Sequence, residues 1–163
     1  MRESIGGAWL FGIVIVFITL FASFLTYSIS YTKAFNTKNK IIEFIEHNEG
    51  YNRYDGDIAV DINAEGKREE VMSTVEGKIF DYMSAIGYNY STEANCDNGD
   101  ETGQGYCLKK ICPYDNNISD VHYKVTTYIN LEIPIIGISM RIPISGETRV
   151  IYRDIGAVQC SNQ

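Results

Sequence analysis

The sequence is poor in the residues that catalysis and nucleic-acid binding require, and it has no charged residue between positions 4 and 32. The net charge of −7 argues against a nucleic-acid partner, which needs a basic surface. The two histidines, His47 and His122, lie outside any known nucleophile motif, and the chain has neither a glycine-rich phosphate loop nor a metal-protease helix. We therefore predict no enzymatic activity, no cofactor and no nucleic-acid partner.

The uncharged run is long enough to cross a lipid bilayer. A transmembrane helix needs about 20 apolar residues, and residues 8–29 supply them with only Gly, Ser and Thr in between. The run is too long for an ordinary signal peptide and no Ala-x-Ala site closes it, although a removed signal peptide is the alternative. We predict an uncleaved, single-pass transmembrane helix over residues 8–30, preceded by a short cytoplasmic tail over residues 1–7.

The same helix is expected to continue outside the membrane. Residues 31–48 contain no Pro or Gly, and Ile41, Phe44 and Ile45 belong to an amphipathic pattern that stops before Gly50. A helix over residues 8–48 is about 60 Å long, so residues 31–48 form an extramembrane continuation. Residues 49–163 then make one exported α+β domain, which is long enough to bury a modest core.

Small and polar residues recur along one side of the predicted anchor, at steps of three and four residues. In lipid, small residues let two helices approach closely, and hydroxyl groups can hydrogen-bond across the interface. The stripe therefore predicts a helix-packing face; the alternative is that the Ser and Thr side chains hydrogen-bond to their own helix. This helix-packing face consists of Ala8, Gly12, Thr19, Ser23, Thr26 and Ser30, with Val16 in the one gap.

All four cysteines, Cys96, Cys107, Cys112 and Cys160, follow the anchor, and their even number predicts two disulfides in an exported domain. A zinc site is the alternative, but no pair has the close spacing that such sites usually contain. Three connectivities are possible, of which we favour Cys96 with Cys107 and Cys112 with Cys160. The cysteines also favour a C-terminal domain outside the membrane and an N-terminus inside, against a slight excess of Lys after the anchor.

The acidic residues of the domain do not form a recognised metal site. The stretch that starts at Asp61 resembles the beginning of a calcium loop, but its twelfth position is Met72, where a bidentate Glu is required. Asp97, Asp100 and Glu101 lack a recognised spacing. We expect residues 51–66 to be a solvated loop and predict no bound metal.

A second amphipathic helix is predicted over residues 67–86. Apolar residues recur there at steps of three and four, and Gly87 is a suitable end for the helix. These spacings place the apolar side chains on one face of the helix, and this face must pack against another part of the domain. Its apolar residues are Val71, Val75, Ile79, Met83 and Ile86.

The last third of the chain predicts an antiparallel hairpin. Residues 121–133 and 138–152 alternate apolar with polar side chains, and residues 134–137 join them. Pro143 cannot donate an N–H, so its strand is expected at a sheet edge or at a bulge. Residues 88–92 and 105–111 are candidates for further strands. A four-residue loop brings the apolar side chains to one face by pairing Ile133 with Ile138, Leu131 with Met140, Ile129 with Ile142, Asn130 with Arg141 and Lys124 with Glu147.

This order of elements resembles pilin-like proteins and, more narrowly, the TadE-type pseudopilins of tight-adherence (type IV-like) pilus systems in bacteria. The resemblance is carried near the N-terminus by residues 7–12 (GAWLFG) and 31–35 (YTKAF). Near the other end it is carried by residues 123–127 (YKVTT), 133–137 (IPIIG) and 142–148 (IPISGET).

The resemblance implies a pilin-like fold and a role as a minor pilin or pseudopilin in a surface pilus or secretion apparatus. The implied partners are other pilin-like subunits, a membrane assembly platform and the lipid bilayer, in an oligomer or filament. The implied location is the cell membrane or an extracellular fibre. Gly7 is the candidate prepilin-peptidase site, and Gly12 stands five residues later, where processed pilins usually carry Glu.

Two other functions stay open on the residues alone. One is a membrane-tethered extracellular binding module, an adhesin or a sensor, whose helix only anchors it. The other is an exported enzyme of a type that no motif in the sequence indicates.

Overall fold

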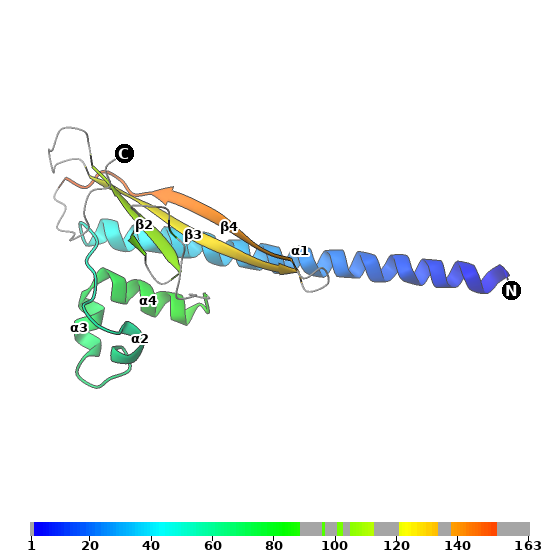
Figure 1. Ribbon diagram of the computed structural model, residues 1–163, viewed down its shortest axis with the longest axis horizontal. Helices are drawn as coiled ribbons and strands as arrows, with labels where there is room; N and C mark the ends of the chain where they lie inside the picture. Colours follow the sequence, from blue (N-terminus) through cyan, green and yellow to red (C-terminus); the bar gives the residue numbers. More distant parts are fainter. Residues whose placement is uncertain are drawn as a thin grey trace.

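The computed structural model describes residues 2–88, 96, 101–102, 105–112, 121–133 and 138–152. One long helix, α1 (Arg2–His47), runs the length of the molecule, and the other elements gather around its C-terminal half (Figure 1). There α1 is in contact with strand β3 (His122–Ile133), strand β4 (Ile138–Glu147) and helix α4 (Val75–Ala85). The N-terminal half of α1 extends away from this α+β body, as an apolar helix of this length predicts.

Helix α1 corresponds to the helix predicted over residues 8–48, but it begins earlier. The predicted tail of residues 1–7 is helical from Arg2 onward. The helix ends where Glu49 and Gly50 adopt positive φ angles of 51° and 145°, and the N–H of Gly50 donates to the carbonyl of Ile45 at 3.1 Å. Gly50 lacks a Cβ, so it adopts this conformation without strain and the chain leaves the helix axis.

Within the described residues the sheet has four antiparallel strands in sequence order, with β1 (Glu101–Thr102) and β2 (Tyr106–Ile111) before β3 and β4. The predicted hairpin register is confirmed over its whole length, from Ile133 opposite Ile138 to Lys124 opposite Glu147. Among the described strands β4 lies at the sheet edge, which is one of the two positions that Pro143 predicted for it, the other being a bulge. The register is well determined by the sequence because a slip of one residue would turn every apolar side chain to the wrong face.

The remaining strand predictions are confirmed in part. Strand β2 lies within the predicted residues 105–111 and pairs with β3 from Tyr106 opposite Thr127 onward. Tyr88 lies outside any strand, and residues 89–92 fall outside the described residues. Strand β1 was not expected, because two residues are too few for an alternation pattern.

The single helix predicted over residues 67–86 is wrong, because the structure divides it at Thr74 into α3 (Arg68–Ser73) and α4. Thr74 is extended (φ −90°, ψ 153°), and its hydroxyl oxygen accepts a hydrogen bond from the N–H of Gly77 at 3.1 Å. The N–H of Val75 donates to the side-chain oxygen of Asn52 at 2.7 Å. These two bonds satisfy the free N–H groups at the start of α4, so a new helix can begin there.

The loop expected over residues 51–66 contains a one-turn helix, α2 (Ile58–Asp61). The Asp57 carboxylate caps it by accepting the N–H of Ala59 at 3.1 Å. The carboxylate of Asp61 accepts bonds from the Lys67 amine at 3.1 Å and the Tyr54 hydroxyl at 3.0 Å. The Lys67 amine holds the pKa of the Asp61 carboxyl below its ordinary value. Asp61, the first residue of the calcium-like stretch, is thus part of an ion pair.

The main core lies between α1, α4 and the inner face of the sheet. Alternate residues of β3 point into it, and the hydroxyl of buried Thr127 donates to the carbonyl of buried Ala34 at 3.0 Å. A second, smaller cluster joins α2, α3 and α4 through Ile58, Val71 and Phe80. The main core includes Ala34, Ile41, Ile45, Val75, Ile79, Met83, Tyr106, Leu108, Tyr123, Val125 and Ile129.

The corner between α3 and α4 leaves no room for a side chain at Gly77, because a Cβ there would clash with the backbone carbonyl group of Val71. We expect Gly77→Ala to lower the free energy of unfolding by about 2–3 kcal/mol, since the backbone must move. Urea denaturation of the full chain in detergent micelles measures the change. Ser84→Ala, at an exposed position of α4, is the matched control. Equal midpoints for the two variants would contradict this corner geometry.

Candidate functional site

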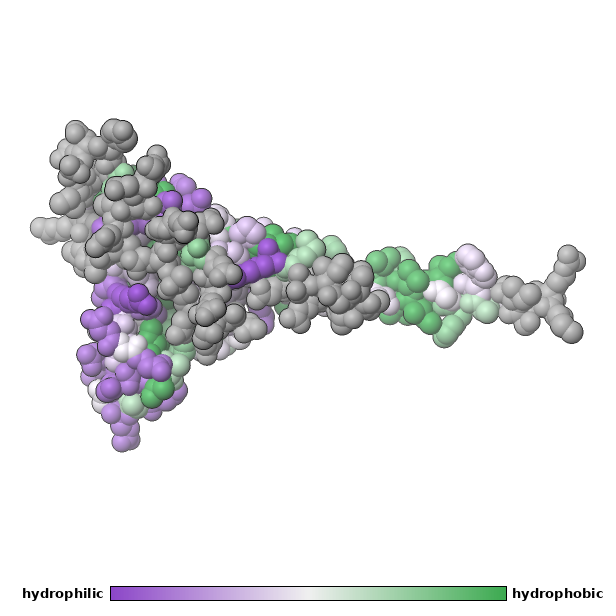
Figure 2. All heavy atoms as spheres, in the orientation of Figure 1, coloured by the Kyte–Doolittle hydropathy of each residue, from purple (hydrophilic) through white to green (hydrophobic). Residues whose placement is uncertain are grey.

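The N-terminal half of α1 is an isolated apolar helix. Its large side chains are open to the surroundings, with Trp9 73%, Phe17 71% and Leu20 65% exposed. Figure 2 shows hydrophobic residues along this part of α1, while hydrophilic residues cover the end of the molecule that carries α2 and α3. An apolar surface of this extent is unfavourable in water. The helix is long and apolar enough to be a single membrane span near the N-terminus.

The helix-packing face of Ala8, Gly12, Thr19, Ser23, Thr26 and Ser30 continues beyond the apolar half of α1. The same steps of three and four residues lead from Ser30 to Ala34, Thr37 and Ile41, all of which are fully buried in the domain. Residues at these steps share one side of a helix. One side of α1 is therefore covered by the protein's own sheet near its C-terminal end and exposed at Ala8, Gly12 and Val16 near the other.

The sequence analysis did not include Ala34, Thr37 and Ile41 in this face. The signal was present, because the spacing is unbroken across residue 30, where the predicted span ends. The continuation of the face was missed because the residue type changes along it. The positions up to Ser30 are small or polar, whereas Ile41 and Ile45 fit the apolar period of an amphipathic helix in water.

The hydroxyl groups of Thr19, Ser23 and Thr26 bond within α1. Thr19 donates to the carbonyl of Ile15 at 2.9 Å, Ser23 to that of Thr19 at 2.9 Å, and Thr26 to that of Ala22 at 3.1 Å. This is the alternative that the sequence left open for these side chains. Close packing through Ala8 and Gly12 needs no hydroxyl bond, so the helix-packing face stays a prediction.

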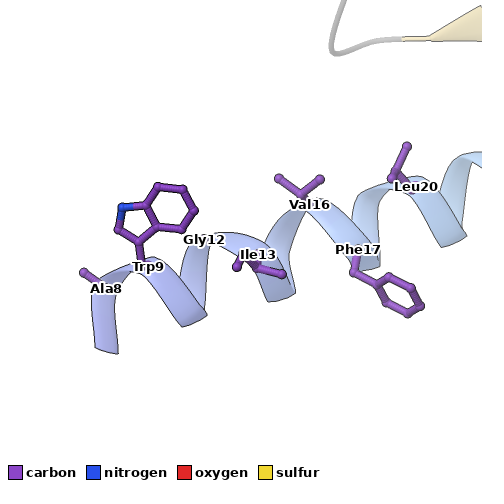
Figure 3. A pocket seen from close by; sticks show the side chains of 7 residues that line it. All are labelled: Ala8, Trp9, Gly12, Ile13, Val16, Phe17 and Leu20. Carbon is purple, nitrogen blue, oxygen red and sulfur yellow. The ribbon is translucent and has the colours of Figure 1, made fainter. Parts of the chain in front are cut away.

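A hollow lies on the apolar half of α1 at Gly12. It has a volume of about 790 Å³ and is lined only by residues of α1. Figure 3 shows Trp9 and Val16 projecting from the helix on either side of Gly12, which has no side chain to fill the space between them. A Cβ built on Gly12 would meet no atom within 4 Å. Nothing in the described part of this chain therefore requires glycine at position 12.

Gly7, the candidate peptidase site, lies within α1. A Cβ on Gly7 would also meet nothing within 4 Å. Cleavage after Gly7 therefore stays a prediction of the resemblance.

The cysteines follow the favoured pairing as far as the described residues reach. Cys96 and Cys107 form a disulfide with their Cα atoms 5.6 Å apart. Cys112 is also disulfide-bonded, and its predicted partner, Cys160, lies outside the described residues. The first bridge closes the segment that leads into β2, beside Tyr106 in the core.

A second hollow, of about 490 Å³, lies at the C-terminal end of α1. Arg149 and Glu46 both line it: the backbone N–H of Arg149 donates to the Glu46 carboxylate at 2.8 Å, and its guanidinium lies 3.5 Å from the same group. His47, one of the two histidines, lines the hollow, whereas His122, the first residue of β3, is not among the lining residues. These contacts hold the segment after β4 to the end of α1. Among the described residues, no three His, Cys, Asp or Glu side chains are grouped as metal ligands.

Two buried tyrosines join the segment after α1 to β2. The hydroxyl oxygens of Tyr51 and Tyr106 lie 2.8 Å apart, and both side chains are buried. Burial raises the pKa of each hydroxyl above its ordinary value, and the Glu76 carboxylate nearby acts in the same direction on both. The pair is therefore uncharged at neutral pH and stabilises the domain through one buried hydrogen bond.

Comparisons of the chain with protein-family models, with curated proteins and with solved structures found no match. The choice among the candidate functions therefore depends on the geometry of α1 and of the body that covers its C-terminal half.

The tyrosine pair predicts a loss of stability at alkaline pH. A group whose pKa is raised by folding stabilises the fold fully below its unfolded pKa, near pH 10 for tyrosine, and this stability is lost as the pH rises towards the folded value. We expect the free energy of unfolding to fall above about pH 10, by about 1.4 kcal/mol per pH unit for each such tyrosine. Urea titrations of the full chain over a series of alkaline buffers measure this slope.

The double variant Tyr51→Phe and Tyr106→Phe should reduce the slope. Tyr152→Phe, which alters a side chain that is 77% exposed, is the control and should leave the slope unchanged. Equal slopes in the double variant and the control would rule out the buried pair as the cause.

Proposed function

We propose that this chain is a structural or assembly subunit, a minor pilin or pseudopilin of the TadE type, in a bacterial surface pilus or secretion apparatus. The observation that carries the proposal is the single continuous face of α1, which is buried by the chain's own sheet at Ala34 and Thr37 and exposed at Ala8 and Gly12. A helix that only anchors a domain in lipid has no need of a stripe of small residues.

The proposed partners of the exposed part of this face are the apolar helices of other pilin-like subunits and of a membrane platform. Gly12 supports this because its hollow is open and shallow, as a site for a neighbouring helix must be. In lipid the gain comes from close van der Waals packing, which small residues permit. In an oligomer or filament, the hollow of each subunit would be covered by a helix of a neighbouring subunit.

The body at the C-terminal end of α1 is proposed to face outward from the membrane. Its disulfide between Cys96 and Cys107 suits an oxidising exterior. The solvent side of the β3–β4 hairpin carries polar residues such as Lys124, Thr126 and Ser145, which suit contact with water or with other subunits. The protein would then be a single-pass membrane protein with its N-terminus inside, or a subunit of an extracellular fibre. No catalytic role is proposed.

The membrane-tethered binding module is the rival function, and position 12 distinguishes the two. We expect Gly12→Leu to reduce self-association in the membrane by about tenfold or more, the equivalent of about 1.4 kcal/mol, because the leucine fills the hollow that a neighbouring helix would enter. Ser23→Leu should act in the same direction. Cross-linking of the full chain in membranes of intact cells measures the associated fraction.

Val14→Leu is the matched control, since position 14 lies on the opposite side of α1. This substitution also introduces a leucine, but it leaves the helix-packing face unchanged. Gly12→Leu should leave the amount of folded protein unchanged, because a side chain at position 12 meets no other atom of the chain within 4 Å. Unchanged association in Gly12→Leu would favour the binding module. A gene neighbourhood with a secretion ATPase, two polytopic platform proteins and a prepilin peptidase would favour the pseudopilin.

The proposed orientation is tested through the cysteines. On intact cells, we expect an impermeant thiol reagent to label the chain only after treatment with an impermeant reductant, because Cys96 and Cys107 are disulfide-bonded and outside. Mass spectrometry of the labelled peptides locates the reacted cysteines. Thiols that react only after the cells are lysed would place the domain inside and overturn the orientation.

A further inference from the structure

The end of the β3–β4 hairpin lies beside the apolar part of α1 rather than beside its polar continuation. In Figure 1 the strands extend from the C-terminal end of α1 to about its middle. Two contacts with α1, one from each strand, set the level of the hairpin along the helix.

The first contact belongs to β3. Thr127 donates to the carbonyl of Ala34, so these two residues lie at the same level. Ile133 ends the strand six residues later, about 20 Å further on at 3.3 Å per residue, in the direction of the helix N-terminus. The helix rises by about 1.5 Å per residue, so about 20 Å of strand spans about 13 residues of α1 if the strand runs parallel to the helix. If the strand is inclined by about 45°, it spans about nine residues. Ile133 therefore lies level with about Phe21 to Leu25.

The second contact belongs to β4 and gives the same result. A Cβ on Gly146 would lie 2.9 Å from Lys38 and 3.0 Å from Ile42, so Gly146 lies level with these two residues. Met140 is six residues nearer the hairpin end, which by the same conversion places it level with about Tyr27 to Tyr31. Ile138, paired with Ile133, lies deeper still.

The uncharged run of α1 covers all these levels. From position 4 to position 32 it is about 43 Å long, which matches a bilayer with both headgroup layers. The hydrocarbon core needs about 20 of these residues. This core can cover any stretch from residues 4–23 to residues 13–32, so the hairpin end, level with about residues 21–25, lies either at the outer boundary of the hydrocarbon, against the headgroup layer, or as deep as the middle of the hydrocarbon.

The edge of the sheet decides between these two depths. Strand β4 is an edge strand, and the N–H and C=O groups on such an edge need hydrogen-bond partners that hydrocarbon cannot supply. The headgroup layer supplies them. Tyr27 and Tyr31, at the level of Met140, have the amphipathic side chains that favour this layer. Arg141 is exposed, with its guanidinium 3.8 Å from the ring centre of Tyr128, and can bind lipid phosphate.

We propose that the end of the β3–β4 hairpin, at Met140 and Arg141, rests in the lipid headgroup layer and limits how deeply α1 enters the membrane. The proposal rests on the proposed function only in requiring that α1 spans the bilayer. It shifts the hydrocarbon-embedded part of α1 from the predicted residues 8–30 to about residues 4–23, so that the hairpin end lies at the outer boundary of the hydrocarbon.

Tryptophan quenching by brominated lipids tests this depth in the full chain. Trp9 is the only tryptophan, so Trp9→Phe combined with Met140→Trp or with Tyr152→Trp places one probe at the hairpin or at the far end of the body. Both positions are exposed, 50% for Met140 and 77% for Tyr152, so a larger ring is accommodated. The chains are reconstituted in phosphatidylcholine vesicles with bromine either close to the headgroup or close to the chain end. Intact disulfides, measured by thiol titration, report folding.

We expect the Met140→Trp probe to be quenched by bromine close to the headgroup and much less by bromine at the chain end, and the Tyr152→Trp control to be quenched by neither. No quenching at position 140, with Trp9 of the unaltered chain quenched, would overturn the proposal and leave the anchor intact. Stronger quenching by chain-end bromine would also overturn it, since the hairpin would then lie in hydrocarbon. If Trp9 itself is not quenched, α1 does not span, and the proposed function fails together with this inference.

Discussion

The packing of one side of α1 against β3 and β4 is the contact on which the rest of the structure depends. Ala34 and Thr37 are small and fully buried, so the sheet lies close enough for Thr127 to bond to the Ala34 carbonyl. Further along, Ile41 and Ile45 fill the core together with residues of α4. Helix α4 and strand β2 are attached to this arrangement through the core, and α2 and α3 pack on α4 through the second cluster. The Tyr51 and Tyr106 pair and Arg149 attach the segments that follow α1 and β4.

Under the proposed function, the same side of α1 passes through two environments with opposite requirements. In water, burial of Ile41 and Ile45 is favourable by itself, because apolar surface is removed from solvent. In lipid that driving force is absent, and only close packing favours contact between helices. The change from Ile to Gly, Ala, Ser and Thr along one face follows this difference in solvent. Under the proposed function, the chain covers the first part of the face itself and leaves the second for its neighbours.

The accuracy of the sequence-based predictions depended on how local each pattern was. The hairpin register was predicted residue by residue, because a period of two and a short connection leave one arrangement with all apolar side chains together. The break at Thr74 was missed, because Val71, Val75 and Ile79 keep the same spacing whether one helix or two carry them. It depends on Asn52, which caps α4 from another segment of the chain. The spacing of small residues was enough to predict which residues form the helix-packing face. The hollow at Gly12 could not be predicted in this way, because its shape depends on where the side chains around Gly12 lie.

The sequence by itself determined the apolar helix, its stripe of small residues and the hairpin register, since each depends on residue types at short and regular spacings. Only the tertiary structure decided which side of α1 the sheet covers and where the hairpin ends along it. Both depend on contacts such as that of Thr127 with Ala34, which are 93 residues apart in the chain. A contact of that kind leaves no periodic signal, because it is set by how two finished elements fit together.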